Sequence, residues 1–253
     1  MNITFFFLSI FLLCLPITSV FAIQASSLTG LGPTKKVHAE LIMPDGQGPF
    51  PGVLILHTSG GVKKYDIAYA EELAKEGYAC LVPYYLDAYS ISYETRNWAT
   101  TVYAANILAD FTAEIQYLKD QPKINKEKIG AVGFSMGGYW ALVLAGMEKI
   151  QAGVSYYGAL TGGAVGTEIR YHFEDIFTKH SSPVLVLHGE EDLTVNVKYA
   201  KQLADMLKEI SCTYELHTYP NAGHGFDRGR SLHAPAAGDS WSRTLAFLKK
   251  YLH

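Results

Sequence analysis

The ten residues from Ile129 to Gly138, IGAVGFSMGG, decide the fold class. Within them, Gly133-Phe134-Ser135-Met136-Gly137 matches the pattern Gly-x-Ser-x-Gly. Glycines two residues before and two after the serine let the backbone turn sharply without Cβ clashes, which pushes the serine side chain out above a sheet. The segment therefore predicts a strand, a tight turn at Ser135 and a helix. A glycine-rich turn with an incidental serine is the alternative.

Strand-like and helix-like segments alternate along the rest of the chain. Strands are expected at 37–43, 53–56, 79–82, 129–134, 152–156, 184–187 and 214–218, and helices at 66–75, 101–118, 137–145, 197–210 and 241–252. This alternation predicts an α/β fold with a mostly parallel central sheet and helices on both faces. No repeat or linker interrupts residues 35–253, so a single domain is predicted over residues 23–253.

Residues that follow the strands are the candidates for a site, because ligands bind such sheets beyond the carboxyl ends of the strands. Ser135 is one of them, but a serine hydroxyl is a poor nucleophile until a base removes its proton. His224 is the candidate base: it follows the last expected strand in a loop, and its flanking glycines leave the imidazole free to reach Ser135. His57 and His188, which also end strands, are interpreted as packing or hydrogen-bonded core residues.

The base needs an acid that holds the imidazole in the right tautomer. Asp192 lies in the turn after the strand at 184–187, next to Glu190 and Glu191. Such a turn usually aims one carboxylate inward, and Gly189, three residues earlier, favours Asp192. The alternative is a solvated acidic turn near a helix N-terminus, which the helix dipole favours.

Ester hydrolysis also needs donors for the developing oxyanion. The backbone N–H of Met136, directly after the nucleophile, is one candidate. The second should come from the loop that follows the strand at 53–56, and we choose Ser59, with Thr58 as the alternative.

Three motifs carry a resemblance to a known family. They are Gly-Phe-Ser-Met-Gly-Gly at 133–138, His-Gly-Glu-Glu-Asp-Leu-Thr-Val at 188–195 and Tyr-Pro-Asn-Ala-Gly-His-Gly-Phe at 219–226. With them, the stretch from about Val37 to the end resembles the dienelactone hydrolase family of the α/β-hydrolase superfamily. The resemblance implies an α/β-hydrolase fold and a catalytic triad of Ser135, Asp192 and His224.

The chain departs from this family in three respects. Dienelactone hydrolases proper carry a cysteine where this chain has Ser135, and a glutamate at roughly the position of Thr58. They also bind the substrate carboxylate with two arginines. Arg228 falls where one of them is expected, and 83–88 lacks the other. The resemblance thus makes Arg228 a candidate substrate ligand, although a plain surface arginine is an equal alternative, and it puts dienelactone itself in doubt as the substrate.

The segment from Tyr84 to Trp98 is rich in aromatic residues and follows a strand at the active end of the sheet. It could form a pocket wall or a partial lid, because aromatic side chains are enriched in binding sites as well as in cores. Tyr84 and Tyr85 are therefore candidate substrate-binding residues.

The first 34 residues contain no charged side chain. An apolar run from Phe5 to Leu15 is followed by Ser19-Val20-Phe21-Ala22, which is typical of a secretory signal peptide cleaved after Ala22. We therefore expect residues 1–22 to be removed and the protein to be secreted or periplasmic. An uncleaved anchor helix is the alternative. Of the two cysteines that remain, Cys80 and Cys212, buried thiols are favoured over a disulfide.

The bulk composition narrows the class of partner. The net charge of −3 comes without a basic block, which argues against nucleic acid or an anionic membrane surface. No metal or nucleotide motif is present, so no metal or cofactor is expected. The expected partner is a small-molecule ester or lactone, and the sequence leaves the oligomeric state open.

The leading hypothesis is a serine hydrolase that cleaves small ester, lactone or thioester bonds through an acyl-enzyme on Ser135. The same constellation also serves serine peptidases and acyltransferases. A binding protein that retains the fold without catalysis is the alternative from another class.

Overall fold

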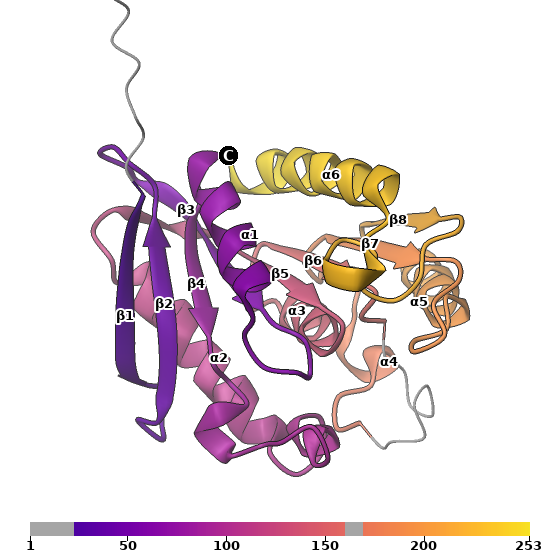
Figure 1. Cartoon of the computed structure of the whole chain (residues 1–253), viewed down its shortest axis with the longest axis horizontal. Helices are drawn as coiled ribbons and strands as arrows, with labels where there is room; N and C mark the ends of the chain where they lie inside the picture. Colours follow the sequence, from indigo (N-terminus) through magenta and orange to yellow (C-terminus); the bar gives the residue numbers. More distant parts are fainter. Residues whose placement is uncertain (1–22, 160–168) are drawn as a thin grey trace, which may run out of the picture.

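The fold is built on one eight-stranded sheet with the strand order β1-β2-β4-β3-β5-β6-β7-β8 (Figure 1). The computed structural model describes residues 23–159 and 169–253. The strands are β1 (Gln24–Leu31), β2 (Val37–Met43), β3 (Phe50–Leu56), β4 (Ala79–Pro83), β5 (Ile124–Phe134), β6 (Ala152–Tyr156), β7 (Val184–Gly189) and β8 (Tyr214–Tyr219). Only the pairs β1–β2 and β2–β4 are antiparallel. The sheet is thus mostly parallel, as the alternating pattern predicted.

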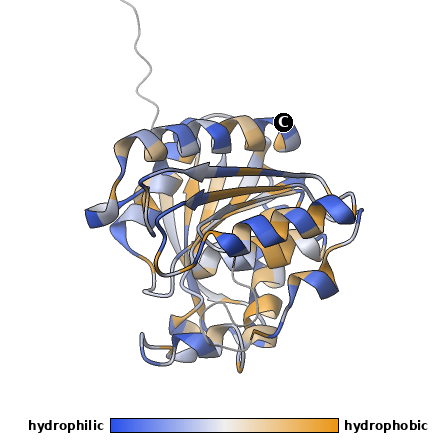
Figure 2. Cartoon of the chain, turned by 90° about the vertical axis from the view of Figure 1, so that its right-hand side faces the viewer, coloured by the Kyte–Doolittle hydropathy of each residue, from blue (hydrophilic) through white to orange (hydrophobic). Residues whose placement is uncertain are grey.

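Helices cover both faces of this sheet. They are α1 (Lys64–Lys75), α2 (Ala104–Lys119), α3 (Met136–Gly146), α4 (Phe173–Ile176), α5 (Lys198–Glu209) and α6 (Ala234–Leu252), with 3-10 turns η1 (Asp87–Tyr89), η2 (Arg96–Ala99) and η3 (Gly229–Ser231). The buried side chains of α2, α3 and α5 join one apolar cluster, and those of α1 and α6 join a second. In Figure 2 the apolar strands lie between helices whose outer sides are polar.

Alternation along the strands explains the two clusters. In β3, Leu54 and Leu56 pack with the first cluster, whereas Val53 and Ile55 pack with the second. Successive side chains of a strand point to opposite faces, so a strand covered on both sides must be apolar throughout. Because β3, β5, β6, β7 and β8 run parallel, their carboxyl ends meet along one edge of the sheet.

The sequence located the interior strands and missed parts of the periphery. β1 was not expected, because its polar sequence is mostly exposed at the edge of the sheet. α6 begins at Ala234, seven residues before the expected start at Trp241. Its first turns read Ala-Pro-Ala-Ala-Gly-Asp, a loop-like composition, but Pro235 is tolerated in a first helical turn and the His233 side chain accepts a hydrogen bond from the Ala236 N–H.

Two further expectations concern the termini and the cysteines. The expected signal peptide, residues 1–22, lies outside the described residues. Across 23–159 and 169–253, no helix is long and apolar enough to cross a membrane. Cys80 and Cys212 are both buried free thiols, as expected.

The helix α2 buries two carboxyl groups that lack the usual partners. Glu114 has neither carboxyl oxygen hydrogen-bonded, and Asp110, one turn earlier, accepts a hydrogen bond from the Tyr89 hydroxyl through one oxygen only. Burial, together with the neighbouring Asp110, raises the pKa of Glu114 well above its usual value. Burial therefore favours the protonated form of Glu114 in the folded protein.

This burial makes stability depend on pH. A carboxyl whose pKa is raised by folding loses its contribution to stability as the pH rises above its unfolded pKa. We expect Glu114→Gln to match the wild type in free energy of unfolding near pH 4. Near pH 8 it should exceed the wild type by on the order of 1 kcal/mol. Denaturant unfolding at both pH values checks this, with the exposed Glu127→Gln as the control. An equal pH response in wild type and Glu114→Gln would contradict it.

Candidate active site

The turn at Ser135 joins β5 to α3 and has the geometry that the motif predicted. Ser135 has φ 54° and ψ −115°, a left-handed backbone that is costly for a residue with a side chain. A Cβ on Gly133 would lie 2.0 Å from the carbonyl oxygen of Gly137, and one on Gly137 would lie 2.0 Å from that of Leu56. Both positions must therefore be glycine for α3 to start this close to β5 and β3.

Ser135, His224 and Asp192 form a continuous hydrogen-bonded chain. The Nε2 atom of His224 lies 3.0 Å from Ser135 Oγ, and its Nδ1 atom lies 2.7 Å from Asp192 Oδ2. The three residues follow β5, β8 and β7, so the sheet edge brings together positions up to 89 residues apart. The structure thus unites all three residues that the sequence singled out.

Asp192 is held by more than the histidine. Its Oδ1 atom accepts hydrogen bonds from the backbone N–H groups of Thr194 and Val195, each at 2.8 Å. The buried His188 places Nε2 3.3 Å from Asp192 Oδ2 and 2.8 Å from the carbonyl oxygen of Val195. Burial alone would raise the pKa of Asp192, but the hydrogen bonds from His188 and His224 outweigh it and lower that pKa well below its usual value. Asp192 is therefore a carboxylate throughout the ordinary pH range.

The neighbouring acids are placed differently. Glu190 and Glu191 are exposed, and Glu190 accepts a hydrogen bond from the Thr218 hydroxyl at 2.6 Å. Only Asp192 of the three points inward. The contact between His188 and Asp192 was not foreseen, because no sequence pattern marks a contact between a residue at the end of a strand and one in the turn that follows it.

A cavity of about 630 Å³ opens at Ser135 and His224. Thr58, Ser59 and Met136 line it, so the candidate oxyanion residues share one space with Ser135. His57, the residue before Thr58, anchors this loop: it is buried and stacks on Tyr85 with ring centroids 4.0 Å apart.

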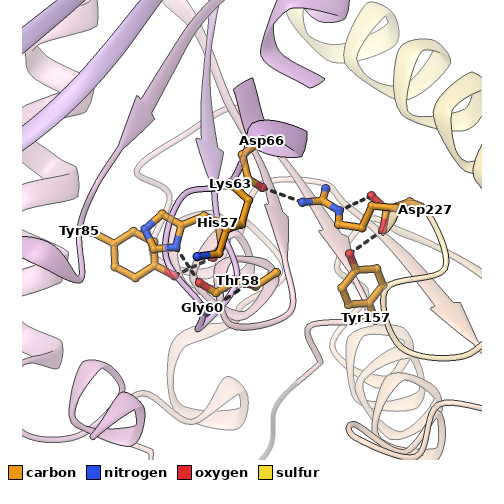
Figure 3. A network of polar contacts seen from close by, with 9 residues as sticks. His57, Thr58, Gly60, Lys63, Asp66, Tyr85, Tyr157 and Asp227 are labelled. Atoms are coloured by element: carbon orange, nitrogen blue, oxygen red, sulfur yellow. Dashed lines mark hydrogen bonds and ion pairs between the residues drawn. The ribbon is translucent and has the colours of Figure 1, made fainter. Parts of the chain in front are cut away.

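Three expected substrate ligands are not brought to this cavity, which corrects their interpretation. Tyr85 is fully buried, and its hydroxyl donates to the carbonyl oxygen of His57. Tyr84 does not line the cavity, and its ring is tilted against that of His38 with centroids 4.6 Å apart. Arg228 does not line the cavity either; it pairs with Asp66 and Asp227, and dashed lines mark these ion pairs in Figure 3.

Other residues take their place along the cavity wall. Those from the segment around η2 are Tyr93, Glu94, Arg96, Asn97 and Thr100. The aromatic segment from Tyr84 to Trp98 was a candidate for a pocket wall or a partial lid, and residues of its second half line the cavity. Sequence favoured the wrong members because aromatic content alone does not separate the buried Tyr85 from the exposed Tyr93. Tyr157, after β6, also lines the cavity and had no motif to mark it.

Comparison with known proteins identifies the family. The family model described as the dienelactone hydrolase family matches residues 37–252. The chain belongs to the dienelactone hydrolase family. Its relatives include a carboxymethylenebutenolidase of Synechocystis sp., 28% identical over 80% of this chain and 87% of the relative. A 2-oxo-3-(5-oxofuran-2-ylidene)propanoate lactonase of Bradyrhizobium sp. is 26% identical over 85% and 89%.

A solved structure has the same fold. The crystal structure of a dienelactone hydrolase from Klebsiella pneumoniae superposes with a TM-score of 0.81 at 24% identity, covering 91% of this chain and all of that one. The α/β-hydrolase fold is thus established. The family and its relatives show that this dienelactone hydrolase family member is a hydrolase acting on ester bonds.

The different surroundings of the Asp192 and Glu190 carboxylates can be tested by substitution. Asp192→Asn should lower kcat by on the order of 10⁴-fold, because the amide would hold the imidazole in the wrong tautomer. Glu190→Gln, a matched change two residues away on an exposed side chain, should leave kcat unchanged. Steady-state ester hydrolysis by both variants checks this, and the reverse result would reassign the acid to Glu190.

Proposed function

We propose that this protein is a serine hydrolase that cleaves small ester, lactone or thioester bonds through an acyl-enzyme on Ser135. The observation that carries the proposal is the chain from Ser135 Oγ through His224 to Asp192, with distances of 3.0 and 2.7 Å. Both distances are within hydrogen-bonding range, as general-base catalysis by histidine requires. The chain also opens on the cavity, so a substrate carbonyl can reach Ser135.

The reaction proceeds in two halves. His224 Nε2 accepts the Ser135 proton while Oγ attacks the substrate carbonyl carbon, which gives a tetrahedral oxyanion. As the ester bond breaks, the imidazolium returns the proton to the departing alcohol, and the acyl group stays on Ser135. A water molecule then gives a proton to His224 and attacks the acyl carbon. Collapse of the second oxyanion breaks the bond from the carbonyl carbon to Oγ, the imidazolium returns its proton to Oγ, and the acid leaves with the Ser135 hydroxyl restored.

Asp192 orients the His224 imidazole and stabilises its protonated form in both halves of the reaction. With Oδ2 on His224 Nδ1, it keeps the proton of the neutral imidazole on Nδ1, so that Nε2 is free to accept one. Its low pKa keeps it anionic, and the anion stabilises the imidazolium that forms in each half of the reaction.

The oxyanion is proposed to accept hydrogen bonds from the N–H groups of Met136 and Ser59. Met136 begins α3, and the first N–H groups of a helix have no partner inside the helix. The carbonyl oxygen of Thr58 lies 2.6 Å from His57 Nδ1 and also accepts from the Gly61 N–H. In a trans peptide the N–H points away from the C=O. The Ser59 N–H is thus directed away from His57, which favours Ser59 over Thr58.

The substrate is proposed to be small. A cavity of about 630 Å³ fits a compact acyl or lactone group of the size that small-molecule sites usually hold. The names of the relatives, a carboxymethylenebutenolidase and a lactonase, agree with this class.

We further propose that the enzyme is exported and works in a secreted or periplasmic form. The support is the uncharged apolar start of the sequence, with small residues at positions −3 and −1 of the expected cleavage site after Ala22. An amino-terminal mass measurement on the exported protein decides the point, because a retained leader would indicate a membrane-anchored enzyme.

The central proposal is tested by hydrolysis of short-chain 4-nitrophenyl esters by residues 23–253. Ser135→Ala should reduce kcat by on the order of 10⁶-fold, because the nucleophile itself is removed. Equal activity in the wild type and the variant would exclude Ser135 as the nucleophile. No activity in either protein, over several acyl lengths, would favour a binding protein.

A further inference from the structure

Arg228 lies in an environment that a substrate-binding arginine does not need. Its side chain is only 13% exposed, between the carboxylates of Asp66 and Asp227. Its Nη1 atom is 2.6 Å from Asp66 Oδ1, and its Nε atom is 2.7 Å from Asp227 Oδ2. Both carboxylates are themselves buried. The positive charge is therefore already matched by the protein's own anions.

The contacts of Arg228 reach three parts of the active site. The guanidinium lies 3.6 Å from the ring centroid of Phe134, the residue directly before Ser135. Asp66 belongs to α1, which follows the loop that carries Thr58 and Ser59 and is called the oxyanion loop below. The Oδ2 atom of Asp66 also accepts a hydrogen bond from the Lys63 N–H at 2.8 Å. Asp227 lies three residues after His224 in the same loop. One side chain thus connects the turn at Ser135, the loop before α1 and the loop that carries His224.

Tyr157 continues this connection to the imidazole. Its hydroxyl donates to Asp227 Oδ1 at 2.5 Å, and its ring packs edge-on against His224 with centroids 4.7 Å apart. Tyr157 has φ 41°, a left-handed backbone that side chains rarely adopt. The Tyr157 N–H donates a hydrogen bond to the Leu187 carbonyl oxygen at 2.7 Å, which fixes the backbone at this residue. The phenol is thus held at one end by the backbone and at the other by Asp227.

We propose that Arg228 is a positioning residue that acts through Asp227 and Tyr157 to hold the His224 imidazole against Ser135, and that it does not bind substrate. The inference rests on the proposed function, in which His224 is the base. Without Arg228, two buried carboxylates lose their counter-ion, and Asp227 is free to turn toward solvent. Tyr157 then loses the anchor of its hydroxyl, and the contact that confines the imidazole loosens.

The proposal predicts a particular kinetic pattern. Tyr157→Phe keeps the ring and removes the anchor, and Arg228→Met removes the charge. Both should lower kcat by about 10- to 100-fold, because small displacements of a catalytic group have effects of this size. KM should stay within about twofold, and neutral and anionic substrates, such as 4-nitrophenyl acetate and 4-nitrophenyl hemisuccinate, should be affected equally. Arg228→Lys, which keeps the charge, should recover part of the loss.

A matched control separates positioning from general loss of a hydrogen bond. The Tyr219 hydroxyl donates to Asp239 at 2.9 Å, also a tyrosine–aspartate pair, but Tyr219 is packed on Phe226 rather than on His224. Tyr219→Phe should leave kcat unchanged. Thermal unfolding of each variant shows whether it is folded, and if Arg228→Met does not fold, Tyr157→Phe and Arg228→Lys decide the matter.

A spectroscopic measurement tests the positioning without turnover. The proton between His224 Nδ1 and Asp192 should give a low-field ¹H NMR signal, assigned by its loss in His224→Gln. It should broaden or shift in Tyr157→Phe and Arg228→Met, and stay in place in Tyr219→Phe.

Several outcomes would overturn the inference. A rise in KM confined to the hemisuccinate ester in the Arg228 variants would make Arg228 a substrate ligand. Unchanged kcat and an unchanged NMR signal in Tyr157→Phe would remove the positioning role. Failure of the proposed function is distinct, because it would appear as equal activity in the wild type and in Ser135→Ala. The NMR signal would still test the placement of His224.

Discussion

The left-handed turn at Ser135 is the constraint on which the rest of the site depends. It brings the start of α3 so close to β3, β5 and β6 that side chains cannot fit at Gly133, Gly137 or Gly158. A Cβ at Gly133 or Gly158 would meet backbone atoms of α3, and one at Gly137 would meet the backbone at the end of β3, so the turn fixes β3 and β6 relative to Ser135 as well as β5. The cost of the unusual backbone at Ser135 is offset by this packing, in which every residue of α3 is buried.

The sequence predicted correctly those parts of the molecule in which the same physical rule determines the residue pattern and the fold. Parallel strands buried on two faces are apolar throughout, and their carboxyl ends share one edge, so Ser135, Asp192 and His224 could be grouped before any coordinates. It failed where the answer depends on side-chain direction. Arg228 pairs with Asp66, 162 residues earlier, and no local pattern specifies that partner. The polar edge strand β1 and the loop-like start of α6 were missed because their sequences lack the periodicity of a covered element.

The buried surroundings of Arg228 also give a physical account of how this chain departs from its family. The resemblance placed an arginine near the substrate and a glutamate near Thr58. Here the carboxylates that face Arg228 come from α1 and from the histidine loop, and Thr58 is held instead through the neighbouring His57. His57 keeps Nε2 buried without a partner, and burial lowers its pKa to about 4. It is therefore neutral above that pH, with one N–H, and the short contact from Nδ1 to the Thr58 carbonyl uses it.

The buried residues His57 and His188 contact different groups, but both do so in the same way. His57 directs one peptide of the oxyanion loop, and His188 reaches both Asp192 and the Val195 carbonyl, so each uses one ring nitrogen to fix backbone near a reacting group. Each also leaves its other nitrogen buried and unpaired, at a cost of about 1–3 kcal/mol. Apolar residues of similar shape would avoid that cost, but they would leave the Thr58 peptide and the Asp192 carboxylate with fewer constraints. The two histidines thus lower the stability of the fold and in return fix the direction of the Thr58 peptide and of the Asp192 carboxylate.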